Sequence, residues 1–204
     1  MNKFFYEFCK IIIKPFIKII FPYEVKGIEN AKSFKDSGYV LCSNHLSNVD
    51  PVFLILINPT PINFMAKQEL FKSKIVSFFL KMLGVFPVNR GKGDKRALEY
   101  AIKIPSKKEV LGIFIEGTRS KTGEFLRPRS GATLIASKSN SDVLPVCITG
   151  GGQNGKIKAF KKTTIIYGKK IEGSCLNFEN RLQLKQSTEM IMGSIKKLRI
   201  NRGN

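Results

Sequence analysis

Side chains that carry acid–base or redox chemistry near neutral pH are scarce in this chain of 204 residues. There is one histidine, His45, so any mechanism that needs an imidazole must use it. The four cysteines lie far apart and form no CxxC pair. Their spacing argues against a zinc site and against a disulfide scaffold, and we expect no metal to be bound.

Acidic residues are also few, since 15 Asp and Glu face 35 Lys and Arg, which gives a net charge of +20. Such a surplus points to an anionic partner: nucleic acid, anionic lipid or a phosphorylated substrate. The lysines are scattered and the aromatic residues gather in apolar segments, so we do not expect nucleic acid to be the partner. Hydrophobic residues make up 43%, enough for the core of one folded domain.

A long uncharged hydrophobic run is absent from the strongly apolar segment 1–23. Lysines at 10, 14 and 18 would lie inside a spanning helix, and a central lysine costs about 2.5–3.5 kcal/mol there. No small-residue cleavage site follows a clean apolar stretch, so the segment also lacks the pattern of a secretory signal. We therefore expect neither a membrane span nor a signal peptide.

The charges of segment 1–23 instead fall on one narrow stripe of a helix. At about 100° per residue, they lie within an arc of roughly 80°, and apolar side chains cover nearly all the rest. One interpretation is a helix packed on the protein's own core. The other, which the wide apolar face favours, is an amphipathic helix lying in a membrane interface, with lysines meeting anionic headgroups.

Strand and helix patterns alternate over residues 24–204, which we expect to form the catalytic domain. Strands are expected at 38–43, 62–67, 84–88, 110–115, 143–148 and 163–168. Helices are expected from Asp50-Pro51 onward and at 69–83, 94–104, 131–138 and 184–200. This alternation predicts a single layered α/β domain with a mostly parallel central sheet flanked by helices.

Polar residues gather where the expected strands end, and the first cluster contains His45 and Asp50. The two would not share a helical face, so they can meet only if His45 lies in a turn and Asp50 begins the helix. Separately, Asp50 reads as a helix cap and His45 as an ordinary loop residue. Together they suit a general base oriented by an acid. The neighbouring Cys42 could be a nucleophile, but its apolar strand favours a buried thiol.

Further clusters follow later strands. Glu116-Gly117-Thr118-Arg119-Ser120 offers a tight turn, hydroxyl groups and a guanidinium suited to phosphate. Arg90 lies just beyond an extended segment, and Arg129 lies where a loop enters a helix. Each cluster alone also fits an ordinary surface turn.

Taken in order, these blocks resemble the 1-acylglycerol-3-phosphate acyltransferase family. Asn44-His45 with Asp50 matches the NHxxxxD motif, and segments 84–90, 114–120 and 143–146 match three further blocks. Ile166-Tyr167-Gly168-Lys169 also resembles the late strand and turn of the family. The chain departs from the pattern at Ile115, where proline is usual, and at Asn89, where an acid is common. Four ordered blocks are far more specific than one.

The resemblance implies that His45 removes a proton from the free hydroxyl of a lysophospholipid while that oxygen attacks an acyl thioester. Asp50 would orient the imidazole, and no acyl-enzyme would form. The implied substrate-binding residues are Asn44, Arg90, Glu116, Gly117, Thr118, Arg119 and Arg129. The resemblance implies no cofactor or metal; the co-substrate is acyl-coenzyme A or acyl carrier protein.

The expected partners are thus a lysophospholipid acceptor, an acidic thioester donor and an anionic membrane surface, reached from the cytoplasmic face. Two alternatives stay open. The same residues could acylate glycerol-3-phosphate or another lyso-lipid. A non-catalytic membrane-binding protein would explain the charge and the amphipathic helices but not the polar cluster around His45.

Overall fold

A computed structural model describes residues 2–34, 37–89, 93–176 and 179–200 of the chain. It contains one seven-stranded sheet, ordered β1-β7-β6-β2-β5-β3-β4. Every pair of neighbouring strands is parallel except β6 and β7, which are antiparallel. The strands are β1 (Tyr23–Lys26), β2 (Tyr39–Ser43), β3 (Ile62–Lys67), β4 (Val85–Val88), β5 (Val110–Phe114), β6 (Asp142–Thr149) and β7 (Thr163–Tyr167). The predicted single α/β domain with a mostly parallel sheet is confirmed.

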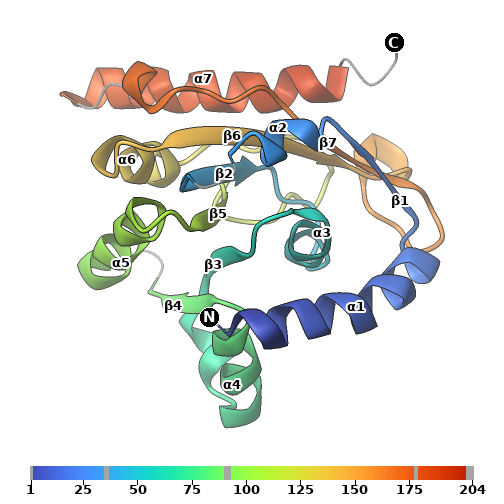
Figure 1. Cartoon of the computed structure of the whole chain (residues 1–204). Helices are drawn as coiled ribbons and strands as arrows, with labels where there is room; N and C mark the ends of the chain where they lie inside the picture. Colours follow the sequence, from blue (N-terminus) through green and yellow to red (C-terminus); the bar gives the residue numbers. More distant parts are fainter. Residues whose placement is uncertain (1, 35–36, 90–92, 177–178, 201–204) are drawn as a thin grey trace.

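Helices cover both faces of the sheet and make three layers, with α7 on one side and α1 on the other (Figure 1). The helices are α1 (Lys3–Ile20), α2 (Glu29–Lys32), α3 (Asp50–Ile57), α4 (Lys74–Met82), α5 (Lys95–Ser106), α6 (Gly131–Lys138) and α7 (Arg181–Ile200). The short 3₁₀ helices are η1 (Gln68–Phe71), η2 (Gln153–Gly155) and η3 (Gly173–Cys175). Among the described residues, no helix is both long and apolar enough to cross a membrane.

Each face of the sheet has its own hydrophobic core. Helices α5, α6 and α7 pack with one face, around Ile113, Ile135 and Ile191. Helix α3 packs on the other face, around Leu41 and Phe53. Because both faces are covered, the central strands β2 and β5 are almost entirely buried, which explains their continuous apolar sequences.

Two local expectations need correction. The single helix expected at 69–83 is two elements, because the chain turns at Ser73 before α4 begins. The Ser73 hydroxyl accepts a hydrogen bond from the Val76 amide at 3.4 Å and so caps the second helix. In addition, β1 was not predicted: α1 ends at Ile20, and Tyr23 already pairs with Thr163 of β7.

Candidate active site

The predicted polar clusters meet at the carboxyl ends of the neighbouring strands β2 and β5. The Ile115 amide donates to the Ser43 carbonyl at 3.0 Å, continuing the pairing of the two strands. Beyond it, the Ser120 amide donates to the His45 carbonyl at 2.8 Å. The loop that carries Glu116 to Ser120 is therefore fastened to the backbone of His45, and two distant segments of the sequence form one site.

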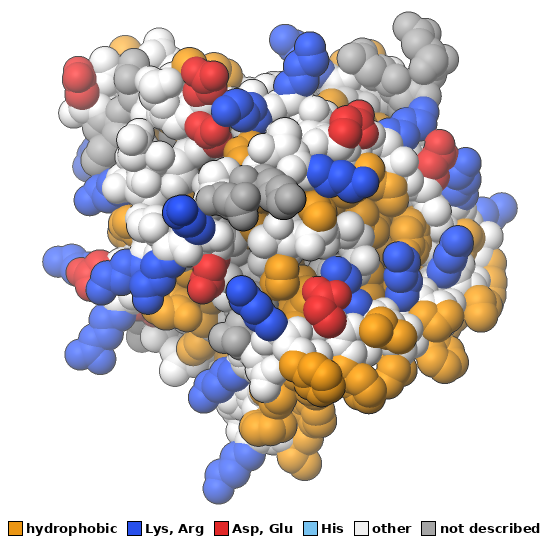
Figure 2. All heavy atoms as spheres, viewed as in Figure 1, with side chains coloured by type: hydrophobic (Ala, Val, Ile, Leu, Met, Phe, Trp, Pro, Cys, Tyr) orange, Lys and Arg blue, Asp and Glu red, His pale blue; other side chains and the backbone are white. Residues whose placement is uncertain are grey.

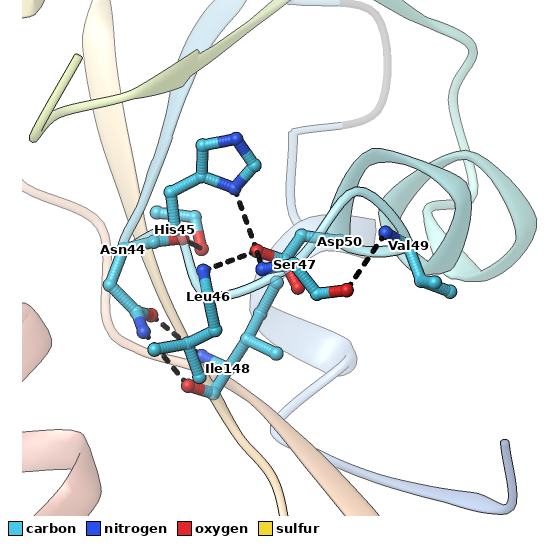
Figure 3. Close-up of polar contacts among 8 residues, drawn as sticks. Asn44, His45, Leu46, Ser47, Val49, Asp50 and Ile148 are labelled. Carbon is cyan, nitrogen blue, oxygen red and sulfur yellow. Dashed lines mark hydrogen bonds and ion pairs between the residues drawn. The ribbon is translucent and has the colours of Figure 1, made fainter. Parts of the chain in front are cut away.

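His45 and Asp50 are in direct contact, as their spacing predicts. His45 Nδ1 lies 2.7 Å from Asp50 Oδ2 (Figure 3). The same oxygen accepts hydrogen bonds from the amides of Leu46 and Ser47 at 2.6 and 2.8 Å. Asp50 is fully buried at the first position of α3, so the turn before the helix forms around its carboxylate. The carboxylate thus holds both the loop and the ring.

The ring of His45 is fixed from a second direction by Phe114. The two rings stack with centroids 3.9 Å apart and an angle of 14° between their planes. An ionised carboxylate only accepts hydrogen bonds, so contact with Asp50 favours the tautomer with its proton on Nδ1. No described residue hydrogen-bonds to Nε2. This nitrogen is therefore the acceptor available for a substrate proton.

The side chain of Asn44 forms hydrogen bonds with the backbone of a neighbouring strand. Its side-chain amide donates to the Ile148 carbonyl at 2.9 Å, and its side-chain oxygen accepts from the Ile148 amide at 2.8 Å. Asn44 is 1% exposed. These bonds extend the pairing of β2 with β6 by one step and so hold the backbone next to His45. Both polar atoms of the Asn44 side chain are used in this way, although the family resemblance implies a substrate-binding role for it.

Beside the His45 loop lies a cleft of about 540 Å³. Phe114, which stacks on His45, is part of its wall, and so are Thr118 and Arg129. Lys67, at the end of β3, also lines the cleft and was not singled out from the sequence. The cleft is thus lined by two cations and a hydroxyl, together with the acid Asp94, and Phe114 connects its wall to the imidazole. The cations and the hydroxyl suit a phosphate group.

Gly117 lets Arg129 cross the loop closely. Gly117 has φ of +70°, a left-handed conformation that side chains disfavour. A β-carbon there would lie 2.6 Å from Arg129 Cδ. The Arg129 amide also donates to the Ile115 carbonyl at 2.8 Å, which holds its backbone beside the loop. Gly117 therefore shapes the loop and leaves room for the guanidinium.

The two other predicted arginines are placed differently. Arg119 is exposed and is not among the residues that line the cleft. Arg90 lies outside the described residues. The alternative nucleophile Cys42 is fully buried, and burial raises the pKa of its thiol to about 12. A thiol with such a pKa is protonated at neutral pH and is a poor nucleophile.

Arg199 of α7 reaches this region from outside the predicted motifs. Its guanidinium donates to the Gly123 carbonyl at 2.9 Å and to the Asn154 carbonyl. The Gly123 amide in turn donates to the Ser120 hydroxyl at 3.1 Å. Through Ser120, which is bonded to His45, the terminal helix is thus connected to the loop of the site.

Glu116 is only 2% exposed although it carries a carboxyl group. Burial raises the pKa of this carboxyl to about 7, because the charged form loses its hydration. The backbone amides of Leu126 and His45 lower the pKa in part, and the nearby Asp50 raises it. Protonation of Glu116 therefore changes over the neutral pH range.

This buried carboxyl predicts a pH-dependent effect of the isosteric variant Glu116→Gln. The folded protein binds the Glu116 proton more tightly than the unfolded chain, so stability decreases as pH rises from about 4.5 to about 7. The variant lacks this decrease. We expect its melting temperature, relative to wild type, to rise between pH 5 and pH 8. The rise should be about 2–4 °C for each kcal/mol of stability that wild type loses over this range.

Thermal unfolding at several pH values measures this difference. Glu99→Gln is the matched control, because it makes the same chemical change at an exposed position on α5. A difference for Glu116→Gln that is constant from pH 5 to pH 8 would contradict the raised pKa.

Comparison with known proteins assigns this site to a family. The family model described as Acyltransferase matches residues 22–149, which include His45, Asp50 and the Glu116 loop. The chain belongs to the acyltransferase family. Arg199 lies beyond the matched region of that family.

Similarity to individual acyltransferases supports this assignment. The chain is 30% identical to the 1-acyl-sn-glycerol-3-phosphate acyltransferase of Bacillus subtilis, over 95% of this chain and 96% of that protein. It is 32% identical to the enzyme of the same name from Streptococcus pneumoniae, over 57% of this chain and 43% of that one. The crystal structure of the 1-acyl-sn-glycerophosphate acyltransferase PlsC from Thermotoga maritima has a similar fold. Its TM-score is 0.75 at 24% identity, over 97% of this chain and 80% of that one.

Proposed function

We propose that this acyltransferase transfers a fatty acyl group from an acyl thioester to the sn-2 hydroxyl of 1-acyl-sn-glycerol-3-phosphate, giving phosphatidic acid. The observation that carries the proposal is the 2.7 Å contact of His45 Nδ1 with Asp50 Oδ2 beside a cleft lined by Lys67 and Arg129. The similarity to the Bacillus subtilis enzyme along nearly its whole length supports this choice of acceptor.

The reaction needs one proton acceptor and no covalent intermediate. His45 Nε2 takes the proton of the sn-2 hydroxyl as that oxygen attacks the thioester carbonyl carbon. Asp50 stabilises the imidazolium that forms, as the acid of a catalytic triad does. When the tetrahedral intermediate collapses, the carbon–sulfur bond breaks and the imidazolium returns the proton to the leaving thiolate. The products are an ester and a free thiol.

The charged groups of the cleft hold the acceptor. Lys67, Arg129 and the Thr118 hydroxyl bind its phosphate, and this fixes the distance between the reacting hydroxyl and His45. Positioning of this kind contributes several kcal/mol to the rate. The net charge of +20 also attracts the anionic donor, either acyl-coenzyme A or acyl carrier protein.

The enzyme reaches its lipid substrate by resting on the cytoplasmic face of a membrane. Exposed hydrophobic side chains of α1 and α4 form a surface that we name the apolar surface. Its members are Phe4, Phe8, Ile11, Ile12, Ile13, Phe16, Ile19, Ile20, Ile75, Val76, Phe78 and Phe79. The two helices meet where the rings of Phe5 and Phe79 lie 6.0 Å apart. Figure 2 shows hydrophobic side chains gathered over this side of the molecule, with lysines beside them. Such a surface suits the boundary between headgroups and acyl chains.

Thiol release tests the proposed reaction. Purified enzyme in liposomes receives lysophosphatidic acid with acyl-coenzyme A or with acyl carrier protein, and the free thiol is measured. We expect release that requires the acceptor. Parallel reactions with glycerol-3-phosphate and with a lyso-lipid that has another headgroup test the choice of acceptor. Faster release with either one than with lysophosphatidic acid would contradict it, and no release with any acceptor would contradict the acyl transfer.

A further inference from the structure

Phe160 lies in the loop before β7 and has an unusual combination of exposure and backbone conformation. Its side chain is 73% exposed. Its φ is +58°, in the left-handed region that bulky residues rarely adopt. Such a conformation is strained and persists only where the surroundings hold it. No burial of the ring within the protein compensates for this strain.

Backbone hydrogen bonds to the end of α1 hold the loop in place. The Phe160 amide donates to the Ile20 carbonyl at 2.7 Å. The Thr163 amide donates to the Pro22 carbonyl at 2.8 Å. The turn is closed by the Lys161 amide, which donates to the Lys158 carbonyl at 3.3 Å. The loop thus presents Phe160 beside Ile20, at the end of the apolar surface defined above.

Exposed lysines lie close to Phe160 in the sequence of the loop. Lys158 and Lys161 flank Phe160 and are exposed, and Lys156 lies exposed nearby in the same loop. Lys162 instead pairs with Glu24 of β1 at 2.6 Å, which ties the loop to the sheet. A loop that carries an exposed ring and exposed lysines fits an anionic lipid surface, because the ring can enter the acyl boundary while the ammonium groups contact phosphates.

We propose that the loop 156–162 is a separate attachment point for an anionic lipid bilayer, with Phe160 as the inserting residue. This inference rests on the membrane docking in the proposed function. The bilayer is then contacted at both ends of α1. Helix α4 makes contact near Phe5 at one end, and the loop makes contact near Ile20 at the other. Contacts at both ends set the orientation of the enzyme on the membrane, which contact along a single helix would leave free to rotate.

The variant Phe160→Gly tests the loop with two effects of opposite sign. Glycine adopts positive φ without strain, so the melting temperature should rise, by about 2–4 °C. Loss of the ring should weaken binding to vesicles of phosphatidylcholine and phosphatidylglycerol about 10- to 100-fold, since one buried aromatic side chain is worth that much. A residue with only a structural role would show lower stability instead.

Co-sedimentation with vesicles measures the binding. Leu182→Ser is the matched control, because Leu182 is 65% exposed on α7, across the sheet from α1, and its loss should leave binding unchanged. Lys158→Gln combined with Lys161→Gln should weaken binding to the anionic vesicles and not to pure phosphatidylcholine. Equal weakening on both vesicle types would overturn the role of the lysines.

A further variant distinguishes failure of this inference from failure of the proposed docking. Phe8→Ser with Phe16→Ser removes two rings from the apolar surface of α1. If that variant binds weakly while Phe160→Gly binds like wild type, the loop is not an attachment point and the inference is overturned. If neither change weakens binding, membrane docking itself is overturned. A fall in the melting temperature of Phe160→Gly would also overturn the inference about the loop, because the ring would then belong to the protein's own packing.

Discussion

His45→Ala should lower the rate of acceptor-dependent thiol release by about 10²–10⁴-fold, the usual contribution of a general base. No other histidine exists in the chain to replace it. The buried Asp50 accepts hydrogen bonds from two backbone amides as well as contacting the ring. The loop should therefore keep its shape without the imidazole, and the loss should fall on kcat much more than on the KM of the acceptor. Steady-state rates of thiol release at varied acceptor concentration give both values.

Asn48→Ala is the control for this prediction, because Asn48 is an exposed residue of the same loop. Vesicle binding by His45→Ala should equal that of wild type, since His45 is not part of the apolar surface. Undiminished thiol release by His45→Ala would refute the role of the imidazole. Retained vesicle binding without any activity in wild type would instead favour the non-catalytic membrane-binding alternative.

The central sheet could be predicted because its strands are buried on both faces. The sequence of β5, VLGIF, is apolar throughout, and a short apolar run between turn signals is typical of such a strand. Edge strand β1 gives no such signal. Its sequence, YEVK, is half polar, and it pairs with β7, about 140 residues further along the chain. Such a pairing depends on the tertiary structure, which local patterns do not contain.

The contact between His45 and Asp50 could be predicted for a different reason. Pro51 is suited to the first turn of a helix and so indicates where α3 begins. With that position known, a spacing of five residues brings a turn residue and a helix-initial acid together. Lys67 and Arg199 carry no comparable local signal. Lys67 belongs to the site only because the end of β3 reaches the cleft, and near the site Arg199 contacts only the loop beyond Ser120, at the Gly123 carbonyl.

The loop after β5 shows where a motif match stops being informative. The resemblance implies that residues 116 to 119 all bind substrate, but the structure gives them different surroundings. Glu116 is buried, Thr118 lines the cleft, and Arg119 is exposed away from the cleft lining. Side chains one residue apart in a turn point in different directions, so a shared motif does not give them a shared role.

Asp50→Asn should reduce kcat by about 10²–10⁴-fold while changing the fold little. The asparagine oxygen can still accept the amide protons of Leu46 and Ser47, so the turn before α3 is retained. What disappears is the negative charge that, in the proposed mechanism, stabilises the imidazolium of His45 during proton transfer. The asparagine nitrogen would take the place of Oδ1, which is buried and has no hydrogen-bond partner among the described residues. Kinetics and thermal unfolding of the same preparation separate the two effects.

Asp142→Asn provides a close match for this variant. Asp142 also accepts a backbone hydrogen bond, from Gly173 at 2.9 Å. It is the first residue of β6, however, and so lies at the opposite end of the strands from the site. Its loss should cost some stability and no activity. If Asp50→Asn behaved in the same way, Asp50 would be only a structural residue.

The double variant His45→Ala with Asp50→Asn decides whether the two residues act as one unit. In the proposed mechanism, Asp50 acts on the reaction only through the imidazole. Once His45 is absent, the second substitution therefore has no catalytic group left to affect. The double variant should therefore be about as active as His45→Ala alone, far above the product of the two separate losses. Losses that multiply would mean that Asp50 acts on the substrate independently, and the base-and-orienting-acid mechanism would have to be abandoned.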